Sequence, residues 1–180
     1  MLNEIQQVIE TADLLYTEKQ VDAALDRMAQ TIHAFLEQRN PLLLCVMNGG
    51  MVTTGKLLTR LTFPLTLDAL NASRYRNQLS GSQIQWLHKP QTPLANRTVL
   101  IVDDILDEGI TLRAIYDYCR EQGASSIYSA VLVNKKLPYP KPIQADFVGL
   151  EIENRYVFGY GMDYKGYCRN LAGIYAVKEF

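Results

Sequence analysis

The chain of 180 residues is poor in the residue types that build metal centres and disulfide frameworks. Its three cysteines, Cys45, Cys119 and Cys168, lie far apart, and its two histidines, His33 and His88, are isolated. No Cys-x-x-Cys pair is present, so we expect free thiols in a reducing cytoplasm and no Cys/His metal site. Apolar runs stay well short of the roughly 18 residues that a membrane-spanning helix requires, so no such helix is expected.

A dominant charge of one sign is also lacking. Lysine and arginine total 18, and aspartate and glutamate total 19, which leaves a formal net charge of −1. This balance argues against a broad basic surface, so no nucleic-acid partner is expected. The N-terminal stretch MLNEIQQVIE has no basic region followed by an apolar core, so we expect no signal peptide and a cytoplasmic protein.

Apolar runs and helical periodicities alternate regularly along the chain. We predict helices over 18–36, 51–61 and 110–122, and strands over 41–47, 63–70, 84–90, 99–102, 125–133, 146–152 and 156–161. Thr17 and Gln20 have the spacing of a capping box at the start of the first of these helices. The alternation predicts a single α/β domain over 1–180, with a helical N-terminal region over 1–40 and a mostly parallel central sheet flanked by helices.

One near-match to a known nucleotide-binding motif is misleading. Gly50, Gly55 and Lys56 follow the phosphate loop of nucleoside triphosphatases, G-x-x-x-x-G-K-[ST]. The match fails at Leu57, where that loop needs a hydroxyl to meet magnesium. It also fails in placement, because the predicted helix has begun by Met51. We therefore expect Gly55 to let this helix pack closely and Lys56 to be a solvated surface residue.

The strand predicted over 99–102 runs directly into the acidic residues Asp103, Asp104, Asp107 and Glu108. Burial of a strand favours apolar side chains and gives no reason for four acids within six positions. Carboxylates at a strand end can accept hydrogen bonds from vicinal hydroxyls or hold a magnesium ion. Capping of the following helix would account for Asp107 or Glu108, but not for the Asp103–Asp104 pair.

Gly109, Ile110 and Thr111 follow these acids and open the next predicted helix. Free backbone N–H groups at a helix start, together with the permissive backbone of glycine, form a cradle for a phosphate group. The Thr111 hydroxyl can add one donor. The segment therefore offers ligands for hydroxyls or a metal, a candidate base and a phosphate cradle, and a ribose 5-phosphate carries the complementary groups.

Residues 99–111 follow a longer pattern: an apolar strand, two acids, two apolar residues, an acid, a variable residue, glycine, a variable residue and threonine. This pattern resembles the phosphoribosyl-diphosphate signature of the type I phosphoribosyltransferases. The resemblance implies their α/β fold, with a small hood region and a mobile active-site loop, here over 71–83.

Four further motifs narrow the resemblance: VMNGG at 46–50, ASRYRN at 72–77, VLVNKK at 131–136 and RYVFGYGMDYKGYCR at 155–169. With them, residues 40–177 resemble the hypoxanthine-guanine phosphoribosyltransferases. The resemblance implies phosphoribosyl diphosphate and a free purine base as partners, Mg²⁺ as cofactor, and a homo-dimer or homo-tetramer.

The resemblance assigns phosphoribosyl-diphosphate binding to Asn48, Gly49, Asp103, Asp104, Glu108, Gly109, Ile110, Thr111 and Arg169. It assigns Mg²⁺ to Asp103, Asp104 and Asp163. Asn48 stands where the family often has lysine, so one charge contact to the diphosphate is missing. Glu108 stands where serine or threonine is common. Because a carboxylate facing a phosphate is unfavourable, we expect Glu108 to point into solvent.

The purine is assigned to Lys135, Tyr156, Val157 and Asp163. The Lys135 ammonium would favour a 6-oxo purine, which presents an acceptor, over a 6-amino purine, which presents donors. Tyr156 would stack on the purine, and Val157 would meet the base edge through its backbone. Asp107 is the candidate general base, or hydrogen-bond partner, at purine N7.

The predicted mobile loop contains Ser73, Arg74 and Tyr75. A Ser-Tyr pair is usual in the family, and here Arg74 stands between the two residues. Arg74 or Arg76 could supply the charge missing at Asn48. Closure of this loop would exclude water, which otherwise hydrolyses the activated sugar.

The implied reaction is transfer of 5-phosphoribosyl to N9 of hypoxanthine or guanine, which gives IMP or GMP and diphosphate in purine salvage. Two alternatives stay open. The base could be xanthine, adenine or uracil, and the sequence does not rank hypoxanthine, guanine and xanthine. A non-catalytic RNA-binding regulator on the same fold would need a basic face, which the balanced charge does not favour.

Overall fold

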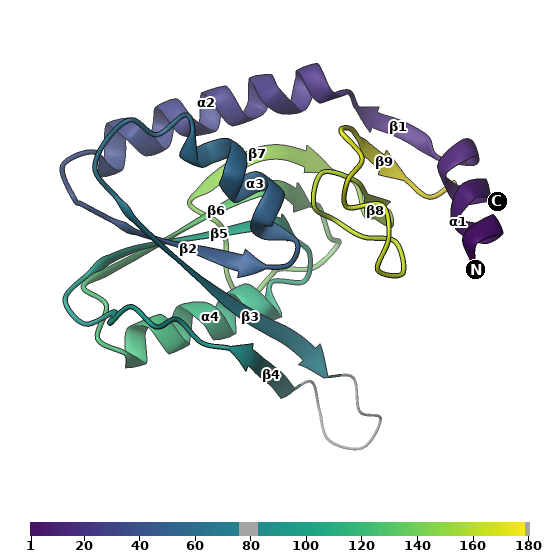
Figure 1. Cartoon of the computed structure of the whole chain (residues 1–180). Helices are drawn as coiled ribbons and strands as arrows, with labels where there is room; N and C mark the ends of the chain where they lie inside the picture. The colour runs from purple at the N-terminus through teal and green to yellow at the C-terminus, as the bar shows by residue number, and fades with distance from the viewer. Residues whose placement is uncertain (76–82, 179–180) are drawn as a thin grey trace.

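Within residues 1–75 and 83–178, which the computed structural model describes, a six-stranded sheet runs through the middle of the molecule (Figure 1). Its strand order is β4-β3-β2-β5-β6-β7. The strands are β2 (Leu42–Met47), β3 (Thr66–Tyr75), β4 (Gln83–His88), β5 (Thr98–Leu106), β6 (Ser126–Lys135) and β7 (Phe147–Ile152). Neighbours from β3 through β7 are parallel, and β4 is antiparallel to β3. The predicted mostly parallel sheet is confirmed.

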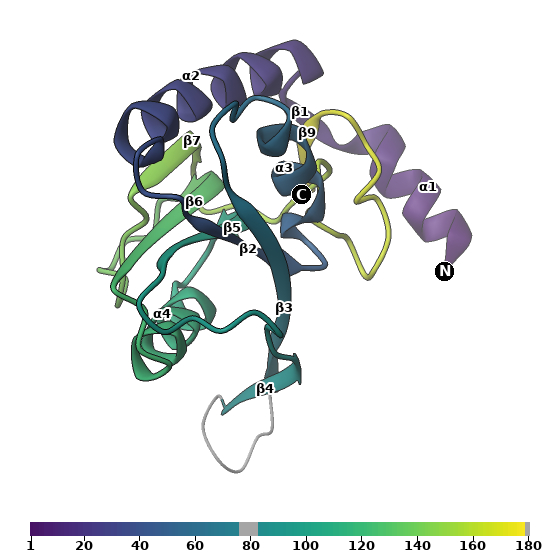
Figure 2. The same cartoon turned by 60° about the vertical axis from the view of Figure 1, so that its left-hand side comes forward.

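Helices cover both faces of this sheet. They are α2 (Glu18–Leu36), α3 (Gly50–Leu58) and α4 (Ile110–Glu121). Figures 1 and 2 show α2 and α3 on one face and α4 on the other. The predicted capping box opens α2, because Thr17 and Gln20 each accept a hydrogen bond from the other's backbone N–H. Over the described ranges, none of the helices combines the length and the apolar character that a membrane crossing needs.

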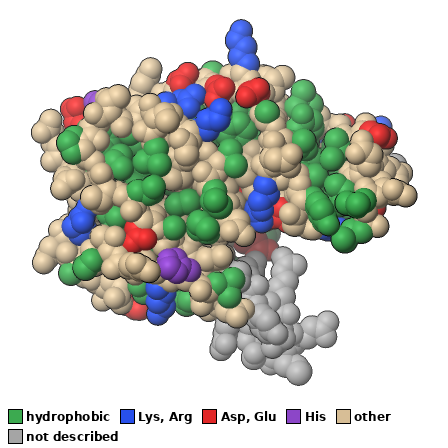
Figure 3. All heavy atoms as spheres, in the orientation of Figure 1, with side chains coloured by type: hydrophobic (Ala, Val, Ile, Leu, Met, Phe, Trp, Pro, Cys, Tyr) green, Lys and Arg blue, Asp and Glu red, His purple; other side chains and the backbone are tan. Residues whose placement is uncertain are grey.

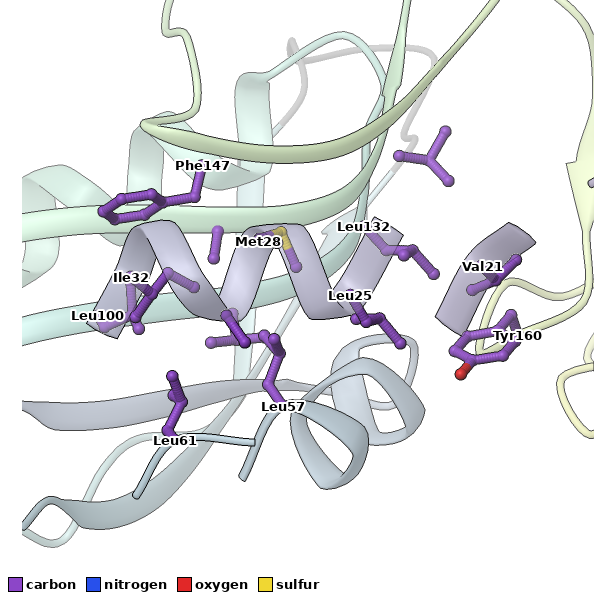
Figure 4. Packing of buried hydrophobic residues seen from close by; sticks show 14 of the residues in the cluster. Val21, Leu25, Met28, Ile32, Leu57, Leu61, Leu100, Leu132, Phe147 and Tyr160 are labelled. Carbon is purple, nitrogen blue, oxygen red and sulfur yellow. The ribbon is translucent and has the colours of Figure 1, made fainter. Parts of the chain in front are cut away.

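The apolar spacing of α2 builds the core between this helix and the sheet. Figure 4 shows Val21, Leu25, Met28 and Ile32 along α2, with Leu57 of α3 beside them. Each of these side chains is buried. Full burial of such a side chain contributes about 1.5–3 kcal/mol, so packing rather than helix propensity holds α2 on the sheet.

β5 lies between β2 and β6, and its apolar run is covered on both faces. Leu100 and Val102 belong to the core cluster with α2 and α3, whereas Val99 and Ile101 belong to the cluster with α4. Successive side chains of a strand point to opposite faces, which explains the unbroken apolar sequence. β5 continues to Leu106, four residues beyond the predicted end at 102, so the acidic pair lies within the strand.

The part of the chain that is described also contains a three-stranded antiparallel sheet, which forms the hood. Its elements, with the helix that packs on them, are α1 (Leu2–Thr11), β1 (Asp13–Tyr16), β8 (Val157–Phe158) and β9 (Ile174–Ala176). The prediction of a helical region over 1–40 is wrong at β1. Asp13 pairs with Ala176 at the other end of the chain, so no local sequence pattern predicts this strand.

β3 is longer than predicted. Asn71 to Tyr75 were expected in a polar loop, but their backbone continues the strand and pairs with β4, from Asn71 opposite His88 to Tyr75 opposite Gln83. Cross-strand pairing therefore overrides the turn-like composition of this segment. Residues 76–82 lie outside the described residues, and the mobile loop stays a prediction.

α3 starts at Gly50, so the near-match to a phosphate loop is helix, as expected. The expectation of close packing at Gly55 is wrong, because a Cβ there would meet nothing within 4 Å. Lys56 is half-exposed and lies 3.8 Å from a carboxylate oxygen of Asp22, which also pairs with Arg60. Figure 3 shows charged side chains of both signs together along this edge of the molecule.

Candidate active site

A polar cavity of about 520 Å³ opens at the carboxyl ends of the parallel strands, where α/β sheets bind their ligands. Its walls come from the ends of β2, β3 and β5, the start of α4, and the hood loop, which is residues 159–173 between β8 and β9. All the residues predicted to bind phosphoribosyl diphosphate line it: Asn48, Gly49, Asp103, Asp104, Glu108, Gly109, Ile110, Thr111 and Arg169.

The acidic pair forms the floor of this cavity. Asp103 accepts the backbone N–H of Asp104 at 2.9 Å, and Asp104 accepts that of Ile105 at 2.7 Å, which fixes both carboxylates. Burial raises the pKa of the Asp103 carboxyl well above its ordinary value, and the neighbouring Asp104 raises it further. Burial also raises the pKa of Asp104, while Arg169, 4.0 Å away, opposes this. Two crowded carboxylates of this kind favour a bound cation.

The donor set at this floor fits Mg²⁺. Asp103 and Asp104 supply hard oxygen ligands at the wall of an open, polar cavity, and Asp163 lines the same cavity. Among the described residues there is no cluster of three or more acidic, histidine or cysteine side chains that could hold a metal by itself. The remaining ligands would therefore be oxygens of the substrate and water, which is the usual arrangement for Mg²⁺ beside phosphates.

The turn after β2 touches both the acidic pair and the hood loop. A Cβ on Gly49 would collide with the carboxylate of Asp104, so glycine is needed for this approach. Gly161 of the hood loop has φ +105°, and a Cβ there would collide with the carbonyl oxygen of Gly49. Asn48, next to this contact, is exposed at the cavity, and the peptide bond that precedes it is cis.

Gly109 precedes the first residue of α4 and adopts φ +81°, a left-handed conformation that favours glycine. This turn brings Ile110 and Thr111, the first residues of α4, to the wall of the cavity. Glu108 is partly exposed and lines the cavity, and the expectation that its carboxylate points into solvent stays a prediction. A carboxylate at a helix N-terminus is favoured by the helix dipole, which accounts for its position.

Asp107 and Lys135 form an ion pair, with Nζ of Lys135 3.1 Å from a carboxylate oxygen of Asp107. The two residues directly follow Leu106 and Asn134, which are register partners in β5 and β6. Lys135 is 9% exposed, whereas the side chain of Asp107 is 51% exposed. The largely buried Lys135 ammonium therefore holds the Asp107 carboxylate in place at the wall of the cavity.

The hood loop places Arg169 beside Asp163. A guanidinium nitrogen of Arg169 lies 2.7 Å from a carboxylate oxygen of Asp163, and another donates to the carbonyl of Gly161 at 2.6 Å. Asp163 also accepts the backbone N–H of Gly166 at 2.7 Å. Arg169 is thus oriented by two partners and points a positive charge at the acidic floor.

The predicted purine residues Lys135, Tyr156 and Val157 do not line this cavity. Tyr156 is 54% exposed, and its ring packs edge-on against Tyr164 with centroids 5.6 Å apart. Val157 is buried in β8. An exposed aromatic ring can stack on a flat base, and the role of Tyr156 in stacking stays a prediction.

Sequence patterns missed some residues of the site. Asn71 and Leu87 also line the cavity, and the register that pairs Asn71 with Met47 brings it there. A third missed residue, Lys141, donates a hydrogen bond to the carbonyl oxygen of Leu106 at 2.7 Å. No local motif marks these three positions, because each depends on strand pairing or on a loop that returns to the sheet.

The predicted mobile loop is not tested by the structure. Ser73, Arg74 and Tyr75 have their backbone in β3, but their side chains lie outside the described residues, as does Arg76. Their assignment to the site therefore stays a prediction.

Residues 11–165 match the family model of the phosphoribosyl transferase domain, so the chain belongs to this family. The hypoxanthine-guanine-xanthine phosphoribosyltransferase of Tritrichomonas foetus is 31% identical over 169 residues, which cover 92% of this chain and 91% of that protein. The solved hypoxanthine phosphoribosyltransferase of Staphylococcus aureus has a TM-score of 0.86 at 25% identity, and that of Trypanosoma cruzi a TM-score of 0.86 at 28% identity. Each match covers 92% of this chain and 91% of the solved chain. The resemblance and the fold class predicted from the sequence are confirmed.

Proposed function

We propose that this protein transfers the 5-phosphoribosyl group of phosphoribosyl diphosphate to N9 of a 6-oxopurine, hypoxanthine or guanine. The products are IMP or GMP and diphosphate, as in purine salvage. The observation that carries this proposal is one cavity that joins an acidic pair, a helix N-terminus with a left-handed glycine, and a lysine-held carboxylate. These groups match the two ends of phosphoribosyl diphosphate and one edge of a purine.

The sugar phosphate would occupy the start of α4. Gly109, Ile110 and Thr111 line the cavity there, and the free N–H groups of a helix N-terminus favour the phosphate charge. Asp103 and Asp104 would accept hydrogen bonds from the two vicinal ribose hydroxyls. Cleavage at the ribose C1 atom develops positive charge, and carboxylates held nearby stabilise it.

The diphosphate would lie between the turn after β2 and the hood loop. Asn48 and Gly49 offer backbone at one side, and Arg169 offers a guanidinium at the other. Asp103 and Asp104 at the floor and Asp163 on the hood loop would hold Mg²⁺ together with oxygens of the substrate and water. When bound, Mg²⁺ neutralises charge on the diphosphate leaving group. Arg169 has to exchange part of its contact with Asp163 for the incoming anion.

The purine would be recognised through the Asp107–Lys135 pair. The Asp107 carboxylate would take the proton from, or accept a hydrogen bond at, purine N7, while the Lys135 ammonium donates toward the 6-oxo group. A 6-amino purine presents donors at this edge and offers the ammonium no acceptor beyond Asp107, so donors would face one another at a buried site, which is costly. Tyr156 would stack on the base.

A wider substrate range is the second candidate. The relative from Tritrichomonas foetus is named for xanthine as well as hypoxanthine and guanine. Xanthine also carries the 6-oxo group that Lys135 would recognise, so the same geometry admits it.

Steady-state rates with phosphoribosyl diphosphate, Mg²⁺ and each free base test the proposal. We expect diphosphate release with hypoxanthine and guanine, and none above background with adenine or uracil. Turnover with xanthine would establish the wider range. Absence of diphosphate release with every purine, or a preference for adenine, would contradict the proposal, and salt-sensitive RNA binding without turnover would support a regulator instead.

We also propose that the protein acts in the cytoplasm as a homo-dimer or homo-tetramer. This is supported by the family resemblance and by the Trypanosoma cruzi relative, whose C-terminal region has a described role in its oligomeric state. Sedimentation velocity across a range of protein concentrations tests the assembly, and a monomer throughout would contradict it.

A further inference from the structure

Lys141 lies on the segment that joins β6 to β7, between Pro140 and Pro142. Proline fixes its own φ angle and restricts the residue before it to extended backbone, so this segment is stiff. The side chain of Lys141 is partly buried and returns to the sheet. Its Nζ atom donates to the carbonyl oxygen of Leu106 at 2.7 Å and to Oδ1 of Asn134 at 2.8 Å.

These two acceptors occupy matched positions on neighbouring strands. Leu106 and Asn134 are register partners at the end of the β5–β6 ladder, and each directly precedes one member of the Asp107–Lys135 pair. One ammonium group therefore joins the two strand ends immediately behind that pair. Burial lowers the pKa of Lys141, and the Asp107 carboxylate opposes this, which is consistent with an ammonium set close to the site.

The neighbouring lysines have other partners. Lys136 is exposed and lies 3.0 Å from a carboxylate oxygen of Glu151 and 3.8 Å from one of Glu153. Lys135, Lys136 and Lys141 all line a cavity of about 460 Å³, but each ammonium is held by its own acceptors. This cavity is therefore poorly suited to an anion, and the contacts of Lys141 require a different explanation.

We propose that Lys141 is a positioning residue for purine recognition, which fixes the ends of β5 and β6 so that Asp107 and Lys135 keep their mutual distance and orientation. The inference rests on the proposed function, in which those two side chains recognise the purine. Two hydrogen bonds from one charged donor to two strands restrain the separation of the strands more strongly than neutral contacts do. The effect should fall mainly on the purine, because the two acceptors of Lys141 directly precede Asp107 and Lys135. The acidic pair lies earlier in β5, where its carboxylates are held by backbone N–H groups of the same strand.

The test compares Lys141→Met with Lys136→Met in the full chain. Both substitutions remove one ammonium from the same segment and keep an unbranched stem, but Lys136 makes exposed surface pairs. We expect Lys141→Met to raise KM for hypoxanthine by about tenfold or more and to leave KM for phosphoribosyl diphosphate within about twofold, since small displacements of a recognition group are costly. Lys136→Met should leave both constants within about twofold.

A rise in KM could also come from a variant that folds poorly, and chemical rescue distinguishes this cause from the loss of the ammonium. Lys141→Cys can be treated with 2-bromoethylamine, which alkylates the thiol, expels bromide and restores an ammonium at nearly the original reach. The natural cysteines Cys45, Cys119 and Cys168 are buried, and burial raises the pKa of each thiol, so the new thiol should react first. We expect aminoethylation to return KM for hypoxanthine to within about threefold of wild type.

Parallel assays of Asp107→Asn and Lys135→Met separate the failure of this inference from the failure of the proposed function. If these two variants keep wild-type constants for hypoxanthine, the assignment of the purine site is wrong. If they are impaired while Lys141→Met behaves like Lys136→Met, the positioning role alone is wrong. Equal increases in both KM values for Lys141→Met, or no rescue by aminoethylation, would also overturn the positioning role.

Discussion

At the scale of single residues, the site depends on glycines that permit contacts no other residue allows. Gly49 lies against Asp104, and Gly161 lies against the carbonyl oxygen of Gly49 with φ +105°. The sequence indicated Gly49, because a glycine turn directly after an apolar strand is a local pattern. It did not indicate Gly161, because the need for glycine there comes from a contact with Gly49, which is far away in the chain.

Gly49→Ala should disable the site. Its methyl group would collide with the Asp104 carboxylate, so the turn after β2 has to move and KM for phosphoribosyl diphosphate should rise at least tenfold. Gly55→Ala is the matched control, because its methyl group enters open space on an exposed face of α3. The control should keep activity and gain about 0.5–1 kcal/mol of unfolding free energy. Equal activity in the two variants, measured with their urea unfolding curves, would refute this role of Gly49.

Asp107→Asn should reduce kcat for hypoxanthine by about 10²- to 10⁴-fold, because the amide cannot take a proton from the purine. Thr111→Ala should instead raise KM for phosphoribosyl diphosphate with a smaller effect on kcat, since it removes one phosphate donor. The side chain of Asp107 is 51% exposed, so the fold should survive. Full activity of Asp107→Asn beside an inactive Thr111→Ala would show that the assignment of the base is wrong.

At the scale of elements, segments with local signals were predicted and segments with distant partners were not. α4 and its stop at Gly123 follow from helical spacing and a glycine with φ +81°. β1 was missed because its partner is β9, near the opposite end of the chain. The extension of β3 through Asn71 was missed because Asn and Ser suggest a loop, while the pairing with β4 decides.

Asp68 shows how one side chain fixes a connection between elements. It accepts the backbone N–H groups of Gln91 at 2.9 Å and Thr92 at 2.7 Å, which holds the segment between β4 and β5 against β3. Burial by itself raises the pKa of Asp68, but hydrogen bonds from the backbone and hydroxyl of Thr92 and from the backbone N–H groups of Ala69 and Gln91 more than offset it, so the pKa is lowered.

The Asp68 contacts should therefore stabilise the fold in a pH-dependent way. At pH 7, Asp68→Ala should cost about 1–3 kcal/mol of unfolding free energy, because it leaves backbone N–H groups without acceptors. A lowered folded-state pKa gives stability that is present above the unfolded value of about 3.9 and is lost as pH falls through the folded value. Urea unfolding at pH 7 and near pH 3 measures this, with the exposed Glu121→Ala as control. A pH-independent cost would contradict the assignment.

At the scale of the whole molecule, a nearly neutral chain places its crowded negative charge at one edge of the sheet. The net charge is −1, yet Asp103, Asp104, Asp107, Glu108 and Asp163 all line one cavity, with Arg169 among them. The balanced charge argued against a broad basic surface, and the alternation of apolar runs with helical periodicities predicted the α/β class, but only the strand order brings the two halves of the site together. The hood was predictable from the family resemblance, not from residue patterns.

Phosphoribosyl diphosphate should stabilise the molecule in a metal-dependent manner. A ligand at a hundred times its Kd adds about 2.7 kcal/mol to the unfolding free energy. With Mg²⁺ present we expect this gain as a rise in Tm. With a chelator present we expect most of the rise to disappear, because the negative carboxylates of the acidic floor then repel the negative diphosphate. In the double variant Asp103→Asn/Asp104→Asn, the difference in Tm between the measurements with and without Mg²⁺ should be smaller. The same rise in Tm with and without the metal would argue against Mg²⁺ at this site.

The most direct measurement of the central claim is the joint quantification of nucleotide and diphosphate formed from phosphoribosyl diphosphate, Mg²⁺ and hypoxanthine. We predict equal amounts of IMP and diphosphate as hypoxanthine is consumed, and no nucleotide when adenine replaces it. Failure to form IMP or GMP from either 6-oxopurine by properly folded protein would contradict the assignment of this cavity as a 6-oxopurine phosphoribosyltransferase site.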